Sequence, residues 1–386
     1  MIRGTTGGLQ TSRARVGWDL RVGAERMRSG FAAMSTGLPR RREMAPSAGQ
    51  PLSAVDREIA SLLAAYRGHQ LFQSVVTLMD SGGKRRRAEM VLAFAAAGEA
   101  PLDDAVGAAV VVEMLHAATL VHDDVIDCAG SRRGQTSANA RLGNSAAVLG
   151  GDLLLALVSA RAARIDSARQ KQGDEVVGFA LKVAQAMQRL VEGEALELQS
   201  AFDPGRSVGQ YLAAIEGKTA TLFALAAVAG LELGGGDAAA TRYANGFALA
   251  YGKAFQITDD ILDVVADPVA IGKPTLNDVR EGVFTLPIIL TAMKDPATRR
   301  VLGGRLVDTD VLREAVRHSR AIEESARYAD DLLGRAERFA DRLRHGELGA
   351  WCYGATGQLR CQLSESIESW RRSQPSSQND VVRGIV

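Results

Sequence analysis

The sequence lacks several features that would place it in a particular class of protein. It has only three cysteines among 386 residues, and so few, in an odd number, argue against a disulfide framework and suit a reducing cytoplasm. The formal net charge is +1, which gives no general case for binding nucleic acid. We find no apolar run that reaches the roughly 20 residues of a membrane span. We therefore expect a cytoplasmic globular protein with no transmembrane segment and no nucleic-acid partner.

The pattern of β-strands is also missing. Apolar and polar residues do not alternate over any segment long enough to build a sheet. Proline is scarce, at 10 residues, whereas alanine and leucine are abundant. From about Ser53 onward, apolar residues recur at helical spacing instead. The sequence thus predicts an all-α fold, a single large helical bundle around a central apolar cavity.

The two ends of the chain differ from the part between them. Residues 1–50 contain nine Arg against one Asp and two Glu, with weak apolar periodicity, and we expect a disordered extension. An organelle transit peptide has the same Arg-rich, acid-poor composition and remains an alternative. Internal methionines leave a misassigned start open as well: Met27, Met34 and Met44. Residues 51–372 are expected to form the helical domain, and residues 373–386 a flexible polar tail.

A short acidic motif closes one of the apolar helical segments. Asp123, Asp124 and Asp127 stand in its last turn, where Asp is a poor helix former and opposes the negative end of the helix dipole. At spacing i and i+4, Asp123 and Asp127 share one face, with Asp124 beside them. Hard oxygen ligands on one face suit magnesium, which typically takes one or two carboxylates and completes its shell with water and substrate phosphates.

The same spacing returns far downstream. Asp259, Asp260 and Asp263 follow the apolar helical run from Phe247. A single motif of this kind is equally well explained by a solvated, salt-bridged helix end, but two copies argue against that explanation. Two acidic helix ends that face each other repel unless cations lie between them. We expect the motifs to meet at a metal site with these ligands: Asp123, Asp127, Asp259, Asp260 and Asp263.

With both motifs in this order, and with basic residues before and between them, the chain resembles the trans-isoprenyl diphosphate synthases, also called polyprenyl synthetases. The resemblance covers roughly residues 53–344. It implies a magnesium-dependent enzyme that joins isopentenyl diphosphate head to tail to an allylic diphosphate and releases pyrophosphate. It also implies a homodimer on the all-α isoprenoid synthase fold.

The resemblance assigns a role to a run of four cations. Two glycines precede Lys84, Arg85, Arg86 and Arg87; by itself, such a run is more simply explained as a solvated loop. Beside two metal motifs it suits a diphosphate-binding loop, since glycine lets the backbone turn close to the anion. By position, Lys84 and Arg87 match isopentenyl diphosphate ligands of the family. Ala88 stands where the family has Pro, and Arg86 where it has an apolar residue, so a cation occupies an expected core position.

Three further basic residues belong to the same expectation. His116 lies seven residues before Asp123, two helical turns back on nearly the same face. A lone His in an apolar helix is usually a core residue, but the family has an isopentenyl diphosphate ligand at this position. Arg132 and Arg133 follow the first motif and could bind phosphates through forked hydrogen bonds.

The segment around Lys218 is expected to be kinked. Gly217 and Thr219 interrupt a helical run, and a kink would let Lys218 point inward. The alternative is a surface lysine, but the family has a Lys-Thr pair on the allylic diphosphate at such a kink. Upstream, Glu192, Glu194 and Glu197 close another helical segment; they could be solvated or could support the site, and the sequence does not decide.

Two more positions complete the expected site. Gln256 matches a family residue near the reacting carbons, and Lys273 matches the start of a family loop, in which Val283 stands where many members have Lys. No side-chain nucleophile is required, because the reaction proceeds through an allylic cation. The expected catalytic residues are Asp123, Asp124, Asp127, Lys218, Gln256 and Asp259.

Product length is expected to depend on the turns before the first motif. The allylic tail must run into the apolar interior, because charge fixes the diphosphate end. Short-chain family members commonly have a bulky aromatic residue at one of two positions that are Ala118 and Thr119 here, both small. The resemblance thus implies a medium- or long-chain product. Phe223 and Phe247 remain alternative floors from other helices.

Other functions share part of this pattern. A class I terpene cyclase also ionises a diphosphate with metal on an all-α fold, but it binds one diphosphate and has no use for Lys84, Arg87 and His116. A regulatory subunit of a heteromeric synthase would be expected to lose acidic motifs, and both are intact. A short-chain, geranylgeranyl-type synthase remains the alternative for product length.

Overall fold

The computed structural model describes residues 50–98, 100–132, 135–171, 178–266, 276–304, 308–343 and 346–372. Its α-helices are α2 Gln50–Leu63, α3 Gln73–Asp80, α4 Arg86–Ala97, α5 Leu102–Ile126, α6 Ala138–Leu142, α7 Asn144–Lys171, α8 Phe179–Gln199, α9 Val208–Ile215, α10 Thr221–Leu233, α11 Ala238–Val265, α13 Asn277–Arg280, α14 Leu286–Lys294, α15 Pro296–Leu302, α16 Thr309–Ser319, α17 Ala321–Ala340 and α18 Gly346–Arg372. The predicted tail lies outside the described residues, as does the predicted extension apart from Gln50.

The remaining regular structure is short. Two 3₁₀ turns cover Ala64–Tyr66 and Gln70–Phe72, and a π-helical turn covers Glu216–Ala220. Within the described ranges, the one sheet is a hairpin of β1, Ser131–Arg132, and β2, Gln135–Thr136, paired antiparallel. The prediction of an all-α bundle is confirmed.

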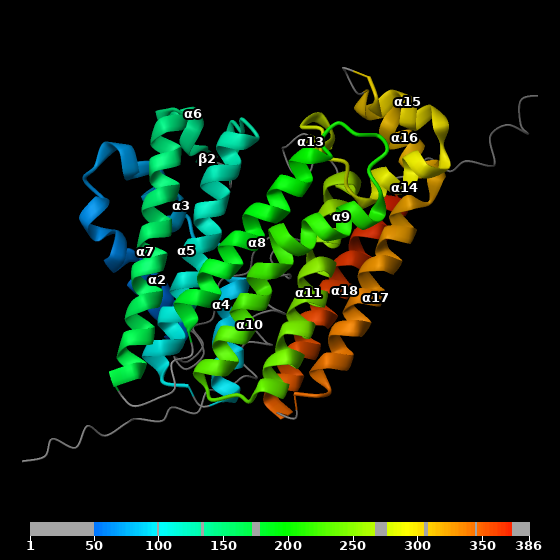
Figure 1. Cartoon of the computed structure of the whole chain (residues 1–386). Coiled ribbons are helices and arrows are strands. Elements are labelled where there is room, and N and C mark those ends of the chain that lie inside the picture. The colour runs from blue at the N-terminus through cyan, green and yellow to red at the C-terminus, as the bar shows by residue number, and fades with distance from the viewer. Residues whose placement is uncertain are drawn as a thin grey trace, which may run out of the picture.

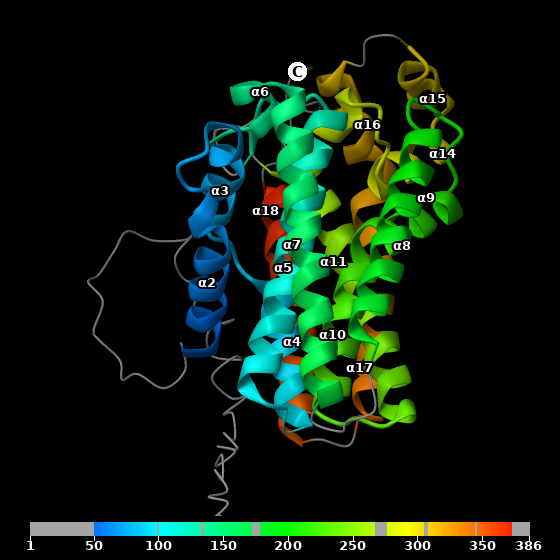
Figure 2. The same ribbon diagram turned by 60° about the vertical axis from the view of Figure 1, so that its left-hand side comes forward.

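The long helices lie alongside one another in one bundle (Figures 1 and 2). Helix α10 is central and packs against α4, α5 and α11. Helices α7 and α8 pack together on one side of this centre, and α17 and α18 pack against α11 on the other. Helices α5 and α11 both end near the top of Figure 1, close to β2 and α13 respectively. This parallel arrangement brings the two acidic helix ends to the same end of the bundle.

Burial explains why the central helices carry apolar residues on every side. Helix α5 buries an unbroken run from Ala105 to Leu115, because neighbouring helices surround it. The outer helix α16 buries only Leu312 and Val316, which are four residues apart and share one face. The distribution of apolar residues in α5 and α16 thus indicates that the first helix is central and the second is peripheral.

Aromatic side chains from four helices meet in the core. The ring of Phe94 on α4 lies 5.9 Å from Phe247 on α11 and 6.0 Å from Trp351 on α18. Phe223 on α10 lies 5.4 Å from Tyr251 on α11. Phe223 and Phe247 are both completely buried, so each is a structural contact between helices as well as a candidate floor for the site.

Three helical stretches are long and apolar enough to cross a membrane by length and composition: Leu102–Ile126, Asn144–Lys171 and Val208–Leu233. These stretches qualify although a few charges interrupt the apolar runs, and the expected absence of a transmembrane segment stays a prediction. Packing in the bundle accounts for the first and third, whose most apolar windows are 78% and 67% buried. In α7 that share is 39%, so the described residues leave much of this window unburied.

Candidate active site

A cavity of about 560 Å³ lies where α5 and α11 end. The π-helical turn, α8, α9 and α13 also contribute side chains to it. Its lining is mainly polar; the apolar part includes Leu120, Ile215, Leu222 and Phe255. Most of the predicted site residues line this one cavity: Asp123, Asp127, Asp259, Asp260, Asp263, Arg87, His116, Lys218, Thr219 and Gln256.

The carboxylates that line the cavity are poorly solvated, which makes their negative charge unfavourable. Asp259 is exposed to the cavity, yet desolvation by the surrounding protein raises its pKa to about 6, although the cations of residues 84–87, Arg86 foremost, act in the opposite sense. Burial likewise raises the pKa of Asp263 and that of Asp278 on α13. Carboxylates in such surroundings favour a bound cation.

The donor set fits a divalent metal that is shared with a substrate. In the described part of the chain, no three His, Cys, Asp or Glu side chains lie close enough to hold one ion together. Magnesium is usually bound by one or two carboxylates together with water and substrate phosphates. Carboxylates from α5 and from α11 line the same cavity, so each motif can supply ligands to ions that a diphosphate also coordinates.

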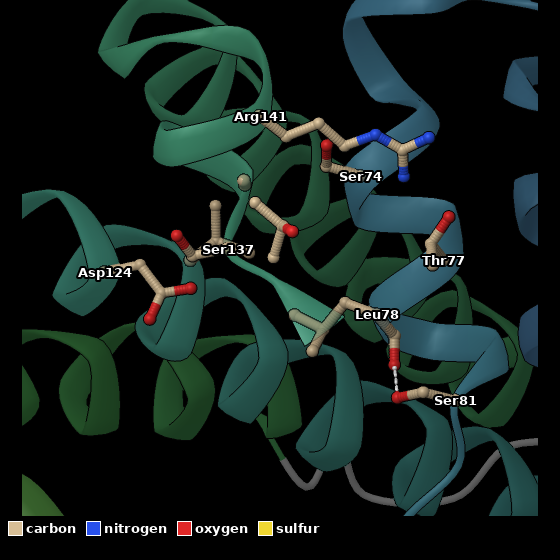
Figure 3. A pocket seen from close by; sticks show the side chains of 10 residues that line it. Ser74, Thr77, Leu78, Ser81, Asp124, Ser137 and Arg141 are labelled. Atoms are coloured by element: carbon tan, nitrogen blue, oxygen red, sulfur yellow. Dashed lines mark hydrogen bonds between the residues drawn. The ribbon is translucent and has the colours of Figure 1, made fainter. Parts of the chain in front are cut away.

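Asp124 does not line this cavity. It is 2% exposed and borders a separate small pocket of about 20 Å³, where Figure 3 shows it beside Ser137, with Ser74 and Arg141 across the pocket. Successive residues of an α-helix point about 100° apart, so Asp124 cannot share a direction with Asp123. The pocket is large enough for about one water molecule, and the geometry suits a structural role at the end of α5.

Asp260 has both carboxylate oxygens occupied by protein donors. Oδ2 accepts from the hydroxyl of Tyr211 at 2.5 Å, and Oδ1 accepts from Nε2 of Gln256 at 2.8 Å. Burial raises the pKa of Asp260 to about 7, although these hydrogen bonds lower it. Each oxygen keeps a further lone pair, so metal binding by Asp260 stays a prediction.

Lys218 points toward the cavity from the π-helical turn. Its Nζ lies 2.6 Å from Oε1 of Glu197 and 2.8 Å from Oε2 of Glu194. Burial lowers the pKa of Lys218, but the charges of Glu197, Asp123 and Glu194 outweigh it and raise the pKa above its ordinary value. The lysine is therefore charged. Of the three glutamates that the sequence left undecided, Glu194 and Glu197 contact it, whereas Glu192 accepts from Nε2 of Gln188 in an exposed contact.

Two glycines make the inward turn possible. At Gly217, a Cβ atom would lie 2.6 Å from the Cα of Gly193 on α8, closer than side chains tolerate. The π-helical turn and α8 therefore approach at backbone contact. The predicted kink is this π turn, which contains one extra residue per turn and is a feature frequent at functional sites. The turn places Lys218 against Glu194 and Glu197.

The cationic loop divides into binding and structural residues. Arg87 lines the cavity and lies over the ring of Phe223 at 4.5 Å, and His116 lines it too. Lys84 is exposed and close enough to act on the charge of Asp259. Arg85 instead turns into the core, where it pairs with Glu113 at 3.3 Å.

The sequence places the cation Arg86 at an expected core position, and the structure shows which groups contact its guanidinium. Its guanidinium lies 5.7 Å from the ring centre of Phe255 and 3.5 Å from Oε1 of Gln358 on α18. It is also the foremost positive charge acting on Asp259. The residue therefore links α4 to α11 and α18 beside the second acidic motif.

Some predicted residues stay untested. The side chain of Arg132, and all of Arg133 and Lys273, lie outside the described residues. Of the two chain-length positions, Thr119 lines the cavity, whereas Ala118 is fully buried and is not part of that lining.

Sequence reasoning missed Tyr211 as a site residue. It is 1% exposed, belongs to the cavity lining and donates to Asp260. A signal was present, because Tyr211 lies seven residues before Lys218 and so two helical turns back on nearly the same face.

Comparisons with known proteins agree with this geometry. The family model described as polyprenyl synthetase matches residues 69–319. A nonaprenyl diphosphate synthase of Mycobacterium tuberculosis is 37% identical over 279 residues, covering 70% of this chain and 78% of that protein. Component 2 of a heptaprenyl diphosphate synthase of Geobacillus stearothermophilus is 31% identical, covering 77% and 91%.

The fold is shared with solved structures as well. A polyprenyl synthase of Caulobacter crescentus, complexed with calcium and isoprenyl diphosphate, has a TM-score of 0.71 and 29% identity, covering 84% of this chain and 99% of that one. The shared part includes both acidic motifs of this chain, the cationic loop and the segment of Lys218, since the family match extends across all of them.

Proposed function

Because the chain belongs to the polyprenyl synthetase family, we propose that it joins isopentenyl diphosphate head to tail to an allylic diphosphate and releases pyrophosphate. The product is a medium- or long-chain polyprenyl diphosphate. The observation that carries the proposal is one cavity lined by two acidic helix ends and by two sets of basic side chains, Arg87 with His116 and Lys218. A reaction between two diphosphates needs two such sets.

Magnesium is the proposed metal. Asp123 and Asp127 on α5 and Asp259 and Asp263 on α11 would hold it, since all four line the cavity. When bound, the metal neutralises charge on the departing pyrophosphate. The Caulobacter protein is complexed with calcium and isoprenyl diphosphate, which supports a divalent cation with a diphosphate in this chain too.

The protein's own side chains hold the two substrates in place. Lys218, fixed by its glutamates, would bind the allylic diphosphate, as an ammonium group binds developing negative charge. Arg87 and His116 would bind isopentenyl diphosphate, with Lys84 at the entrance. The double bond then attacks the allylic carbon, a proton is lost, and the chain grows by one isoprene unit.

Exclusion of water is the second requirement. An allylic cation that meets water forms an alcohol, so the reacting carbons need an apolar boundary. Leu222 and Phe255 supply apolar surface in the cavity close to Thr219 and Gln256 along the chain. The small side chain of Thr119 leaves room for a longer tail, which supports the medium- or long-chain product.

A terpene cyclase is the second candidate, because it also ionises an allylic diphosphate with metal. It binds one diphosphate, so Arg87 and His116 at the same cavity as Lys218 favour the synthase. A cyclase would release pyrophosphate without consuming isopentenyl diphosphate.

We further propose a homodimer in the cytoplasm. Exposed apolar side chains on α7 and α8 support a partner surface: Val148, Leu149, Leu181, Val191, Leu196 and Leu198. The name of the Geobacillus relative, component 2, suggests a heteromer as the alternative. Light scattering would give the mass in solution, and activity of the purified chain alone would show that no second component is needed.

Substitution of the acids tests the metal assignment. Asp123→Ala and Asp259→Ala should each lower the rate by about a hundredfold or more, with an unchanged helical circular dichroism spectrum. Asp330→Ala is the matched control, because Asp330 also precedes a second Asp on a helix but pairs with Arg360 at 2.6 Å outside the cavity. Retention of more than about a tenth of the activity by either cavity variant would contradict the assignment.

A further inference from the structure

Four side chains at the cavity form an unbroken chain of hydrogen bonds. The hydroxyl of Tyr211 donates to Oδ2 of Asp260 at 2.5 Å, and Nε2 of Gln256 donates to Oδ1 at 2.8 Å. Oγ1 of Thr219 then donates to Oε1 of Gln256 at 2.7 Å. The chain joins α9, α11 and the π-helical turn, three elements that meet only in the folded protein.

The direction of these bonds is determined by Asp260. When Asp260 is ionised, both of its oxygens can only accept; Tyr211 donates to Oδ2, and the amide of Gln256 meets Oδ1. Gln256 must therefore turn its amide nitrogen toward Asp260 and its oxygen toward Thr219. Thr219 donates its only hydroxyl hydrogen to that oxygen.

The buried end of the chain is rigidly held. Tyr211 is 1% exposed and Asp260 is 4% exposed. The guanidinium of Arg206 lies 5.7 Å from the ring centre of Tyr211, and its Nη1 donates to the carbonyl oxygen of Phe284 at 3.0 Å. The Tyr211 end of this arrangement is thus held by the protein, and Gln256 and Thr219 line the cavity together with the apolar surface of Phe255.

We propose that Tyr211 is a positioning residue for the reaction: acting through Asp260, it fixes the amide of Gln256 so that the oxygens of Gln256 and Thr219 face the cavity with lone pairs and without hydrogens. Oxygen dipoles oriented in advance stabilise the positive charge that develops when the allylic group loses its diphosphate. The inference rests on the proposed function, because it assigns these oxygens to the allylic side, beside Lys218.

Removal of one hydroxyl tests the proposal. Tyr211→Phe leaves Oδ2 of Asp260 without a donor, so the amide of Gln256 can rotate. We expect kcat to fall by about tenfold or more, with the KM of each diphosphate changed by less than about twofold. Tyr353→Phe is the control, because Tyr353 also donates to an aspartate, Asp341, at 2.7 Å far from the cavity, and it should leave kcat unchanged.

A double-mutant cycle separates positioning from a general structural effect. If Tyr211 acts through Gln256, then Tyr211→Phe should cost less than about twofold in a Gln256→Leu background, because coupled residues are non-additive. Equal costs in both backgrounds, or a loss of kcat that simply follows a lower melting temperature, would overturn the proposal.

A binding measurement keeps this proposal distinct from the proposed function. Calorimetry with magnesium, inorganic pyrophosphate and a prenyl-substituted ammonium ion should show binding about tenfold tighter than that of its neutral carbon analogue, and Tyr211→Phe should abolish this preference. A wild-type chain that shows the preference but consumes no isopentenyl diphosphate would refute the function and support the positioning role. A wild-type chain that condenses both substrates while Tyr211→Phe keeps the preference and kcat would refute only the positioning role.

Discussion

Nζ of Lys218 lies 2.6 Å from Oε1 of Glu197, the residue that ends the buried face of α8. The lysine that faces the cavity is thus already paired with an acid before any substrate arrives. The proposed diphosphate would share this charge with the protein, because the pairing fixes the ammonium group at the cavity. The inward turn of the chain at Gly217 is what makes this pairing possible.

Removal of Lys218 should therefore affect one substrate more than the other. Lys218→Ala is expected to lower kcat/KM for the allylic diphosphate by about a hundredfold and to change the KM for isopentenyl diphosphate little. Lys253→Ala is the control: Lys253 pairs with Glu216 at 2.6 Å, and such a pair near the surface contributes little. Steady-state kinetics with each substrate varied in turn measures both effects.

The proposed assignment of separate cationic residues to each diphosphate predicts the opposite effect for Lys84. Lys84→Ala should mainly raise the KM for isopentenyl diphosphate. If Lys218→Ala and Lys84→Ala weakened both substrates equally, the two cationic sets would not serve separate substrates.

The glycine contact between α8 and the π-helical turn should be intolerant of a side chain. A Cβ at Gly193 would lie 2.3 Å from the backbone nitrogen of Lys218, so Gly193→Ala should cost about 1–3 kcal/mol of stability and displace Lys218. Gly349→Ala on α18, with nothing within 4 Å, should be neutral or stabilising by about 0.5–1 kcal/mol. Urea denaturation compares the two variants, and equal stability would contradict the contact.

Local patterns in the sequence predict much of this arrangement. The acidic ends of α5 and α11, the all-α fold and the kink at Lys218 follow from helical spacing and from residues that break it. The start of α2 was predicted near Ser53 but lies at Gln50, and Pro51 at the second helical position was the missed signal. Asp124 was grouped with Asp123, although the helical rotation of about 100° per residue already separates them.

What the sequence could not predict depends on contacts between distant helices. Glu197 is 21 residues from Lys218, and Tyr211 is 49 residues from Asp260. Neither pair has a local pattern, because each forms only when α8, α9 and α11 pack together. The contact between Arg86 and Gln358 is a similar case, because 272 residues separate them in the sequence.

Stability of the metal-free protein should fall as the pH rises. The pKa of Asp260 is about 7 in the folded protein, raised chiefly by burial from an ordinary value of 3.8. The folded state therefore binds the proton more tightly than the unfolded state, and its contribution to stability is complete below about pH 4 and lost as the pH rises through about 7. Thermal melting in a chelator across this range measures the effect.

The Asp260→Asn variant isolates this contribution from other titrating groups. Its melting temperature should vary less with pH than that of the wild type over the same range. Curves that remain parallel would show that Asp260 does not change its protonation there.

Product length should respond to Thr119 more than to Ala118. Thr119 is half-buried at the cavity, so Thr119→Phe should fill space that the growing tail needs and shorten the main product. Ala118 is 0% exposed, so Ala118→Phe should mainly overpack the core, at a cost of about 1–3 kcal/mol. Chromatography of the dephosphorylated products and thermal melting measure the two outcomes.

The same chromatography can refute the long-chain assignment. An unchanged length distribution in Thr119→Phe would mean that another residue, such as Phe223, forms the floor. A wild-type product as short as geranylgeranyl diphosphate would contradict the medium- or long-chain product directly.

The measurement that tests the central claim most directly follows both substrates at once. Purified protein is incubated with magnesium, labelled isopentenyl diphosphate and allylic diphosphates of several lengths, and pyrophosphate release and label incorporation are recorded together. The account predicts one pyrophosphate for each isopentenyl unit incorporated into a lengthening chain. Pyrophosphate release without incorporation of label would contradict it.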